Sequence, residues 1–351
     1  MHNNLQQNNR IYVLDYIKAI AMVSVIINHC NFTAQMEKDM LYPFFIGLAV
    51  PIFIVVSGFT FSLSYQKKET LGLKHWYARE SILPKLSRFV MPFILIFLLE
   101  LIYKLTIDNM AFNLTSIIRT FFFGGYGPGS YYIPIIIQML FIFPLCYCLV
   151  RKYGFKGVLI LGLIQLIYQF AVYYLDLPDI YYKRIFLRFL IFLGGGIYIF
   201  LHKEDILNSK GKKILLLLSF VVGCIYIYVA NYQGHVPAIF LAWRRTAMPT
   251  ILYVFPVLAV VIATCLHKKI PGKGGDFFSL IGQASYHIFL VQMFWFHIGW
   301  EKTLTYGVEV IVNLALTLTL GILFYRAEAS LRRQLKQRKQ RKNTEIPSAK
   351  M

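Results

Sequence analysis

Residues 11–32 have the sequence IYVLDYIKAIAMVSVIINHCNF, an apolar run that contains one acid, one base and one histidine. Such a run is long enough to cross a bilayer as a helix, and ionisable groups at that depth mark functional sites. Lys18 and His29 are eleven residues apart, so a helix places them on one face, roughly 16 Å apart along its axis. Asp15 precedes Lys18 by three residues and is its neighbour on that face. We therefore predict a membrane helix with a charged pair near its start and an imidazole near its far end.

The composition indicates a membrane protein built from helices. The chain has 351 residues, of which 58% are hydrophobic and 15% charged, and its mean hydropathy is +0.58. Soluble domains usually carry about 25% charged residues. We therefore expect an all-α polytopic bundle with about ten transmembrane helices. The apolar runs that predict them are residues 11–31, 43–65, 89–107, 131–150, 156–175, 184–201, 214–231, 247–266, 278–298 and 305–326.

The distribution of basic residues predicts how this bundle is oriented. With the N-terminus in the cytoplasm, 26 Lys and Arg residues fall in cytoplasmic segments and 7 in external ones. Because cytoplasmic loops carry such an excess, we expect both termini in the cytoplasm. The net charge of +20 lies mainly in these short loops and in the tail 326–350. This pattern indicates the lipid bilayer, with its anionic heads, as the partner of the basic residues, and not nucleic acid.

Three regions are distinguished along the chain. Residues 1–10 form a polar N-terminal tail without the pattern of a cleaved signal sequence, residues 11–326 the transmembrane domain, and residues 327–351 a basic cytoplasmic tail. Within the domain, residues 69–88 are too polar to span, and we expect an amphipathic helix on the cytoplasmic surface there. Residues 124–129, GGYGPG, predict a turn-rich external loop before the fourth span.

Five short motifs follow one another along the chain. They are LDYIKAIAMVSVIINH at 14–29, PIFIVVSGF at 51–59, KLSRFVMP at 85–92, YYI at 131–133 followed by Gln138 and Pro144, and GQASYHIFL at 282–290. Together they resemble the membrane acyltransferase 3 family, whose members O-acylate sugars of the bacterial cell surface. Three positions depart from the family pattern: Tyr131 stands where tryptophan is frequent, Ile136 where some members have glutamate, and Gln292 where histidine is common.

The resemblance implies a multi-pass O-acyltransferase of the bacterial cytoplasmic membrane. Its donor would be acyl-CoA, expected to be acetyl-CoA with succinyl as the other option. The donor would bind from the cytosol as a substrate, with no permanently bound cofactor. The acceptor would be a hydroxyl of a surface polysaccharide or of a lipid-linked sugar that faces outward.

His29 and Asp15 are the expected catalytic residues, because they occupy the family's histidine and aspartate positions. A neutral imidazole can take a hydroxyl proton during attack on a thioester, or it can accept the acyl group itself, and the sequence leaves both routes open. The competing interpretations of His29 are a hydrogen bond donated to a neighbouring helix and a position that faces the outer membrane interface. Asp15 lies at the opposite end of the run, so we expect it to position other groups and not to act as the base.

Three basic residues are the expected donor-binding groups. Lys18 takes the place of a family arginine and suits phosphate as a compact charge, while Lys85 and Arg88 lie one turn apart before the third span. The alternatives are that Lys18 extends to the membrane interface while paired with Asp15, and that Lys85 and Arg88 are ordinary cytoplasmic anchors.

Arg188, Trp243 and Arg244 are the expected acceptor-binding groups. Arg244 lies in an external segment where basic residues are disfavoured, so an anionic or sugar-containing acceptor is one reason for its presence, with Trp243 stacking on it. The alternative is a solvated interface position. Arg188 lies deeper, within the sixth run, and we expect it to pair with Asp176 or Asp179 or to line the cavity.

Several common catalytic patterns are missing from the sequence. The five cysteines form no CxxC pair, and neither HExxH nor GxSxG occurs, so we expect no metal site and no nucleophilic serine of the hydrolase type. A transporter that exports a glycan or lipid intermediate is the alternative function, because buried ionisable groups can also relay protons. A degenerate family member that senses or scaffolds is a third possibility, given Ile136 and Gln292.

Overall fold

The computed structural model describes residues 10–66, 72–241, 243–300 and 305–345, and every regular element in these ranges is a helix. The long helices are α1 (Tyr12–Asn28), α3 (Ala49–Gln66), α5 (Arg79–Thr106), α7 (Tyr132–Tyr153), α8 (Phe155–Tyr174), α10 (Leu190–Leu201), α11 (Lys210–Asn231), α12 (Ile251–Cys265), α13 (Gly272–Ile298) and α14 (Tyr306–Glu345). The short ones used below are α2 (Ala34–Asp39), α4 (Gly72–Trp76), α6 (Leu114–Phe122), α9 (Asp179–Arg184) and the 3-10 helices η5 (Phe186–Phe189) and η7 (Arg244–Thr246).

All ten predicted apolar runs are helical. Among the described residues, eight helical stretches are long and apolar enough to cross a membrane. The remaining two runs, 11–31 and 184–201, form shorter apolar helices: α1 has 17 residues, and a second stretch covers Phe186–Leu201. A helix of that length extends about 25 Å, close to the thickness of a hydrocarbon core. The all-α polytopic prediction is confirmed.

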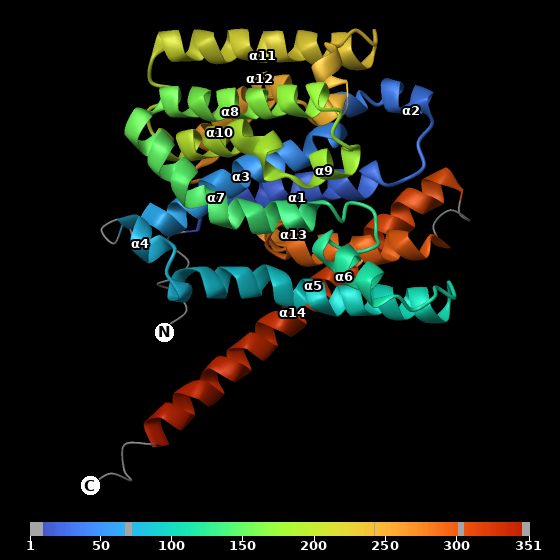
Figure 1. The fold of residues 1–351 in the computed structure, drawn as a ribbon. Coiled ribbons are helices and arrows are strands. Elements are labelled where there is room, and N and C mark those ends of the chain that lie inside the picture. Colours follow the sequence, from blue (N-terminus) through green and yellow to red (C-terminus); the bar gives the residue numbers. More distant parts are fainter. Residues whose placement is uncertain (1–9, 67–71, 242, 301–304, 346–351) are drawn as a thin grey trace.

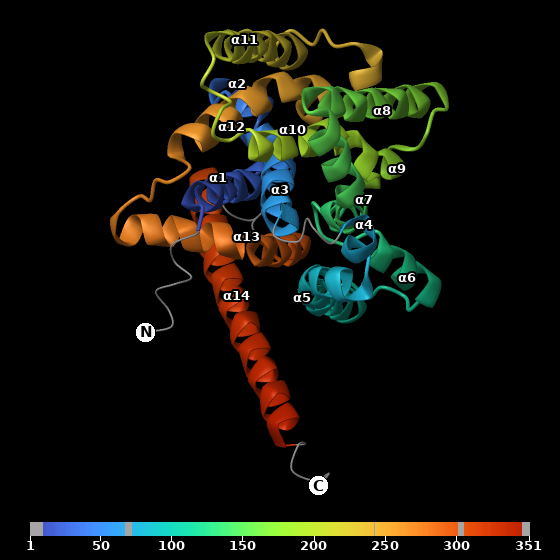
Figure 2. The same ribbon diagram turned by 90° about the vertical axis from the view of Figure 1, so that its left-hand side faces the viewer.

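The helices are arranged around α1 and α3, which lie at the centre of the bundle in both views (Figures 1 and 2). α11 lies at one edge of the bundle, next to α12, and α5 with α6 lies at the opposite edge. The closest neighbour of α1 is α13, and the closest neighbour of α3 is α10. This arrangement places the charged helix α1 inside the protein and not against lipid.

Glycines permit these two closest helix contacts. A β-carbon on Gly282 of α13 would overlap the backbone of Asp15 in α1. Likewise, a β-carbon on Gly58 of α3 would overlap the carbonyl of Leu193, and one on Gly196 of α10 would overlap the carbonyl of Val55. Small residues let membrane helices approach closely, and these glycines serve that purpose.

The expected amphipathic surface helix at residues 69–88 is not present as such. The described part of this segment forms the short helix α4, and α5 already begins at Arg79; residues 67–71 lie outside the described residues. Trp76 is 3% exposed and packs against the rings of Tyr65 and Tyr147. Trp76 therefore packs into the protein, whereas the neighbouring Tyr77 is exposed.

The C-terminal helix α14 is one continuous helix of 40 residues that leaves the bundle (Figures 1 and 2). Its last turns therefore carry the predicted basic tail away from the other helices as far as Glu345; the remainder of that tail and residues 1–9 lie outside the described residues. The start of α1 and the end of α14 lie toward the same side of the molecule (Figure 1). This agrees with an even number of spans, while the cytoplasmic placement of the termini stays a prediction.

Candidate active site

One cavity of about 1440 Å³ lies between the helices, and side chains from α1, α3, α5, α7, α13 and α14 line it together with loops around α2, α9 and η7. Its polar lining forms two groups. The first, which we call the Lys18 end, contains Lys18, Arg88, Gln283, Glu328 and Arg332. The second, the Trp243 end, contains Glu37, Asp179, Lys183, Arg184, Trp243, Arg244 and Arg245. Side chains far apart in the sequence thus surround one space.

His29 follows the last residue of α1 and lines this cavity. Its ring is half-buried and lies 5.5 Å from the ring of Phe296, centroid to centroid. Within the part of the chain that the structure describes, the imidazole makes no hydrogen bond and no ion pair, so the first competing interpretation, a hydrogen bond to a neighbouring helix, does not apply there. The two nitrogens of the ring are therefore available to a molecule in the cavity.

The glycine-rich loop 124–129 forms the wall beside His29. Gly127, Pro128 and Gly129 line the cavity, and the backbone at Gly129 has a φ of +81°. Glu100 of α5, which is fully buried, holds the loop: its carboxylate accepts hydrogen bonds from the backbone N–H groups of Tyr126 at 2.9 Å and of Gly127 at 3.2 Å. The loop had been predicted, but Glu100 had not been singled out.

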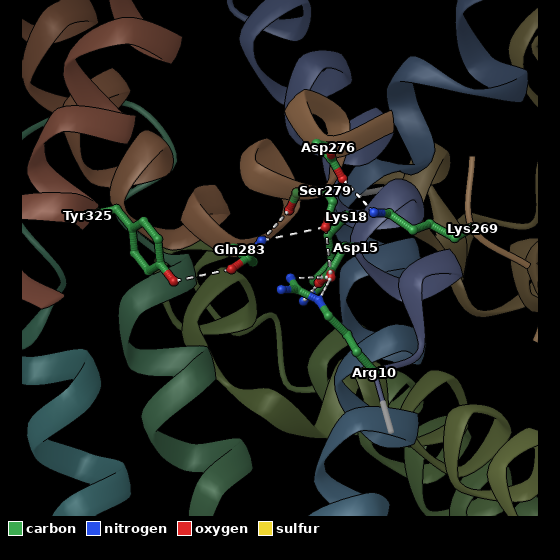
Figure 3. A network of polar contacts seen from close by, with 8 residues as sticks. All are labelled: Arg10, Asp15, Lys18, Lys269, Asp276, Ser279, Gln283 and Tyr325. Carbon is green, nitrogen blue, oxygen red and sulfur yellow. Dashed lines mark hydrogen bonds and ion pairs between the residues drawn. The ribbon is translucent and has the colours of Figure 1, made fainter. Parts of the chain in front are cut away.

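Asp15 is the centre of a polar network at the start of α1 (Figure 3). Its carboxylate accepts two hydrogen bonds from Arg10, at 2.8 and 2.6 Å, and pairs with Lys18 at 3.0 Å. Ser279 of α13 donates to the same carboxylate at 3.4 Å. Asp15 is 6% exposed and is not among the cavity-lining residues. Asp15 is therefore paired with Lys18 and lies at the opposite end of α1 from His29, while its positioning role stays a prediction.

The same network extends across α13 to α14. Gln283 donates to the carbonyl of Ser279 at 3.2 Å, and the hydroxyl of Tyr325 donates to Gln283 at 3.5 Å (Figure 3). Gln283 and Tyr325 both line the cavity. The polar wall of the Lys18 end is therefore built by three helices.

The Lys18 end collects three cations, one of which the sequence did not single out. Lys18, Arg88 and Arg332 come from α1, α5 and α14 and all line the cavity. Arg332 is held in place because it pairs with Glu328 at 2.6 Å and donates to the carbonyl of Ser87 at 3.2 Å. Lys85 is not among the lining residues; its ammonium lies 3.7 Å from the ring centroid of Tyr65. The expected pair of Lys85 and Arg88 is thus divided between two environments.

His287 also lines the cavity at the Lys18 end. It is 7% exposed, and Nε2 forms a short contact with the carboxylate of Glu328. Glu328 therefore connects His287 with Arg332. No sequence pattern could reveal this contact, because the partners are 41 residues apart on two helices.

The Trp243 end is organised around Asp179. Its carboxylate accepts a hydrogen bond from the indole N–H of Trp243 at 2.6 Å and pairs with Lys183 at 2.6 Å. Burial opposes ionisation of Asp179, but the hydrogen bonds from Lys183 and Trp243 outweigh it, so the pKa of Asp179 lies below its ordinary value. Trp243 has a φ of 63°, which is unusual for a bulky residue and is typical of functional sites.

Arg188 neither pairs with Asp176 or Asp179 nor lines the cavity, which corrects both expectations. It is 2% exposed, lies in η5, and donates to the hydroxyl of Thr246 at 2.7 Å. Its guanidinium carbon lies 5.1 Å from the ring centroid of Trp243. Asp179 bonds to Trp243 and Lys183, and not to Arg188. Arg188 lies behind the residues that line the Trp243 end.

The motif residues around the fourth span also have a structural explanation. Gln138 donates to the carbonyl of Arg184 at 2.6 Å and accepts from the N–H of Phe186 at 3.0 Å, which fixes the turn that carries Arg184. Tyr131 and Ile136, two of the departures from the family pattern, line the cavity, whereas Gln292 is buried away from its lining.

The described residues contain no cluster of three or more His, Cys, Asp or Glu side chains that could hold a metal ion. None of the five cysteines, all of which lie within the described residues, forms a disulfide. The cavity is lined by the imidazoles of His29 and His287, by several cations, by the carboxylates of Glu37, Asp179 and Glu328, and by backbone groups of the glycine loop.

Comparison with known proteins adds one finding. A family model described as an acyltransferase domain, Acyl_transf_3, matches residues 11–326. Curated proteins gave no match, and solved structures gave none. The matched range includes His29, the whole Trp243 end and three residues of the Lys18 end, Lys18, Arg88 and Gln283, while Glu328 and Arg332 lie just beyond it.

Proposed function

The chain belongs to the membrane acyltransferase 3 family, and from this premise we propose that it moves an acyl group, expected to be acetyl, from acyl-CoA to a hydroxyl of a cell-surface polysaccharide or lipid-linked glycan. The observation that carries the proposal is the single cavity that joins the Lys18 end to the Trp243 end, with His29 on its wall. Donor and acceptor can enter such a cavity from different ends and meet at the imidazole.

The Lys18 end suits the donor. Coenzyme A carries several phosphate charges, and Lys18, Arg88 and Arg332 supply cations from three helices. Its acyl group sits at the tip of a long flexible arm, so the phosphates can stay at this end while the thioester extends toward His29. Lys18 and His29 are separated by roughly 16 Å of helix, which such an arm can follow. The charge distribution of the loops supports a cytosolic position for the Lys18 end, where acyl-CoA is present.

His29 supports two forms of the transfer. In the first, the acceptor hydroxyl attacks the thioester carbonyl carbon while an imidazole nitrogen takes its proton; the carbon–sulfur bond then breaks, and the thiolate of CoA receives that proton. In the second, the imidazole nitrogen itself attacks the thioester carbonyl carbon, and the carbon–sulfur bond breaks, so that CoA leaves as its thiolate. The acceptor hydroxyl then attacks the acyl-imidazole, the bond between the acyl carbon and the nitrogen breaks, and the hydroxyl proton balances the charge of the thiolate. In both forms Lys18 and Arg88 bind the donor, and Asp15 orients Lys18.

A test of this function uses the purified full chain in liposomes with acetyl-CoA labelled in the acetyl group. We expect CoA release that depends on added surface glycan from the producing bacterium, together with an acetyl mass increment on the glycan. His29→Ala should reduce transfer by about 100-fold or more, since general bases contribute on the order of 10²–10⁴. His235→Ala is the matched control, because His235 is exposed and is not among the cavity-lining residues. Full transfer by His29→Ala would refute the proposed role.

A transporter is the second candidate, because the cavity extends toward both ends of the helices. It predicts movement of glycan or lipid across the liposome membrane without release of CoA. Incubation of the protein with labelled acetyl-CoA in the absence of acceptor, followed by rapid removal of free acetyl-CoA at neutral pH, separates the two catalytic forms. Label that stays on the protein and moves to glycan when the acceptor is then added indicates an acyl-histidine, and absence of label from the protein indicates general-base catalysis.

A further inference from the structure

The Trp243 end holds more positive than negative charge. Its cavity-lining ionisable groups are four cations, Lys183, Arg184, Arg244 and Arg245, and two acids, Glu37 and Asp179. Both acids form intramolecular ion pairs: Asp179 pairs with Lys183 at 2.6 Å, and Glu37 pairs with Arg245 through two hydrogen bonds. Two guanidinium groups therefore face the cavity without a carboxylate partner.

Arg184 is one of these two groups. It donates to the backbone carbonyls of Phe123 at 3.1 Å and Ile180 at 3.2 Å, which fixes the side chain but does not balance its charge. Gln138 bonds to the backbone of Arg184 and fixes its position from a second direction. Arg184 is thus a rigid cation whose counter-charge is missing.

Arg244 is the other group. It is half-buried, and within the described residues its side chain makes no hydrogen bond, ion pair or ring contact. It follows Trp243, whose unusual backbone conformation and bond to Asp179 fix the start of η7. A guanidinium group that is partly desolvated and unpaired costs free energy, unless a ligand supplies the anion.

Arg188 adds positive charge behind this wall. Its Nε and Nη1 atoms are buried, and among the described residues they have no hydrogen-bond partner. Trp243 and Thr246, which contact Arg188, are themselves lining residues. A negative charge placed at Arg184 and Arg244 would therefore also be attracted by Arg188 through a region of low dielectric constant.

We propose that the Trp243 end recognises an acidic acceptor, in which a carboxylate or phosphate close to the acylated hydroxyl binds Arg184 and Arg244. This inference rests on the proposed acyl transfer and specifies its acceptor. The planar donors of arginine match both kinds of oxyanion. The anionic group can belong to an acidic sugar of the glycan or to the diphosphate of a lipid carrier, and these two sources share the same chemistry at this site.

The test measures binding and does not require turnover. The full chain in detergent is titrated calorimetrically with a hexamer of galacturonic acid, with the same hexamer after reduction of its carboxyl groups, and with inorganic pyrophosphate. Arg184→Gln and Arg244→Gln remove the two charges, and Arg244→Lys restores one. Lys38→Gln is the control, because Lys38 is an exposed basic residue of α2 that is not among the cavity-lining residues. Elution of each variant as a single species confirms folding.

We expect the acidic hexamer to bind at least about tenfold more tightly than the reduced one, and Arg184→Gln or Arg244→Gln to remove most of that difference, since hydrogen bonds between charged groups are worth about one to two decades of affinity. Binding of pyrophosphate instead of the hexamer, with the same sensitivity to Arg244→Gln, assigns the charge to a lipid carrier. Equal binding of both hexamers, unchanged affinity in the arginine variants, or no binding of any anionic probe would overturn the inference. Anion binding without any CoA release would refute the proposed acyl transfer and leave the anion site standing.

Discussion

Gly129 lies directly against His29. A β-carbon at Gly129 would stand 3.6 Å from Nε2 of His29 and 3.2 Å from the ring of Phe289. The backbone of Gly129 has a φ of +81°, a conformation that other residues rarely adopt. The glycine thus keeps the space beside the imidazole open, where an acyl carbonyl or an acceptor hydroxyl must fit.

Substitution of Gly129 by Ala should therefore reduce turnover more than it reduces stability. The strained backbone costs roughly 1–2 kcal/mol of folding free energy, while misplacement of reacting groups beside His29 can cost up to about 100-fold in rate. Turnover and thermal unfolding are measured on the same preparation. Gly234→Ala is the matched control, because Gly234 has a φ of +76° and nothing within 4 Å of its β-carbon position. If both variants lose the same activity, the space beside His29 has no specific role.

Substitution of Glu100 by Gln tests how the loop is held. One carboxylate oxygen becomes an amide NH₂ that cannot accept the hydrogen bond from Tyr126 or Gly127, so we expect a loss of about 1–3 kcal/mol of stability and a lower turnover. The Michaelis constant for acyl-CoA should stay unchanged, because Glu100 is not among the cavity-lining residues and lies roughly 18 Å along α5 from Arg88. Glu80→Gln, at an exposed position near the start of the same helix, is the control. A variant at Glu100 with unchanged turnover would show that the loop keeps its place without the carboxylate.

The helices were predictable because a bilayer requires about 20 apolar residues for each span, and this requirement leaves a signal in a single sequence. The face shared by Lys18 and His29 was predictable for a similar reason, since both belong to one helix of fixed period. The segment before α5 forms two helices in place of the one expected, and the burial of Trp76 could not be predicted, because Trp76 gives the same sequence pattern whether it faces lipid or the rings of Tyr65 and Tyr147.

The partners of buried groups could not be predicted. The carboxylate of Glu100 accepts its hydrogen bonds from backbone N–H groups of the glycine loop. Every residue except proline has such a group, so the sequence does not reveal these partners. Arg188 was expected to pair with an acid near it in the sequence, but Trp243 and Lys183 bond to Asp179. In the sequence, Arg332 belongs to the basic tail. It lies beside Ser87 because α14 continues as a straight helix past the last span, which the sequence does not indicate.

Arg332 should bind donor phosphate. Arg332→Ala is expected to raise the Michaelis constant for acetyl-CoA by roughly five- to 50-fold, with little change in turnover at saturating donor. This range corresponds to a loss of about 1–2.3 kcal/mol of binding free energy for a partly exposed contact with phosphate. Arg333→Ala is the neighbouring control, because Arg333 donates only to a carbonyl of its own helix and is not among the lining residues. With acetyl-pantetheine, which lacks the phosphates, wild type and Arg332→Ala should be indistinguishable. A defect that persists with this short donor would assign Arg332 to helix packing.

Lys85 and Arg88 should separate in their effects, although they lie one turn apart on α5. Arg88 lines the cavity, so Arg88→Ala should raise the Michaelis constant for acetyl-CoA in the same way as Arg332→Ala. The ammonium of Lys85 stacks on the ring of Tyr65, so Lys85→Ala should lower the free energy of unfolding by about 0.5–2 kcal/mol. It should change the Michaelis constant for acetyl-CoA by less than about twofold. Lys85→Met keeps the length of the side chain and isolates the contribution of the charge. If Lys85→Ala instead weakens donor binding as strongly as Arg88→Ala does, both cations contact the phosphates of the donor. Lys85 then leaves the ring of Tyr65 when the donor is bound.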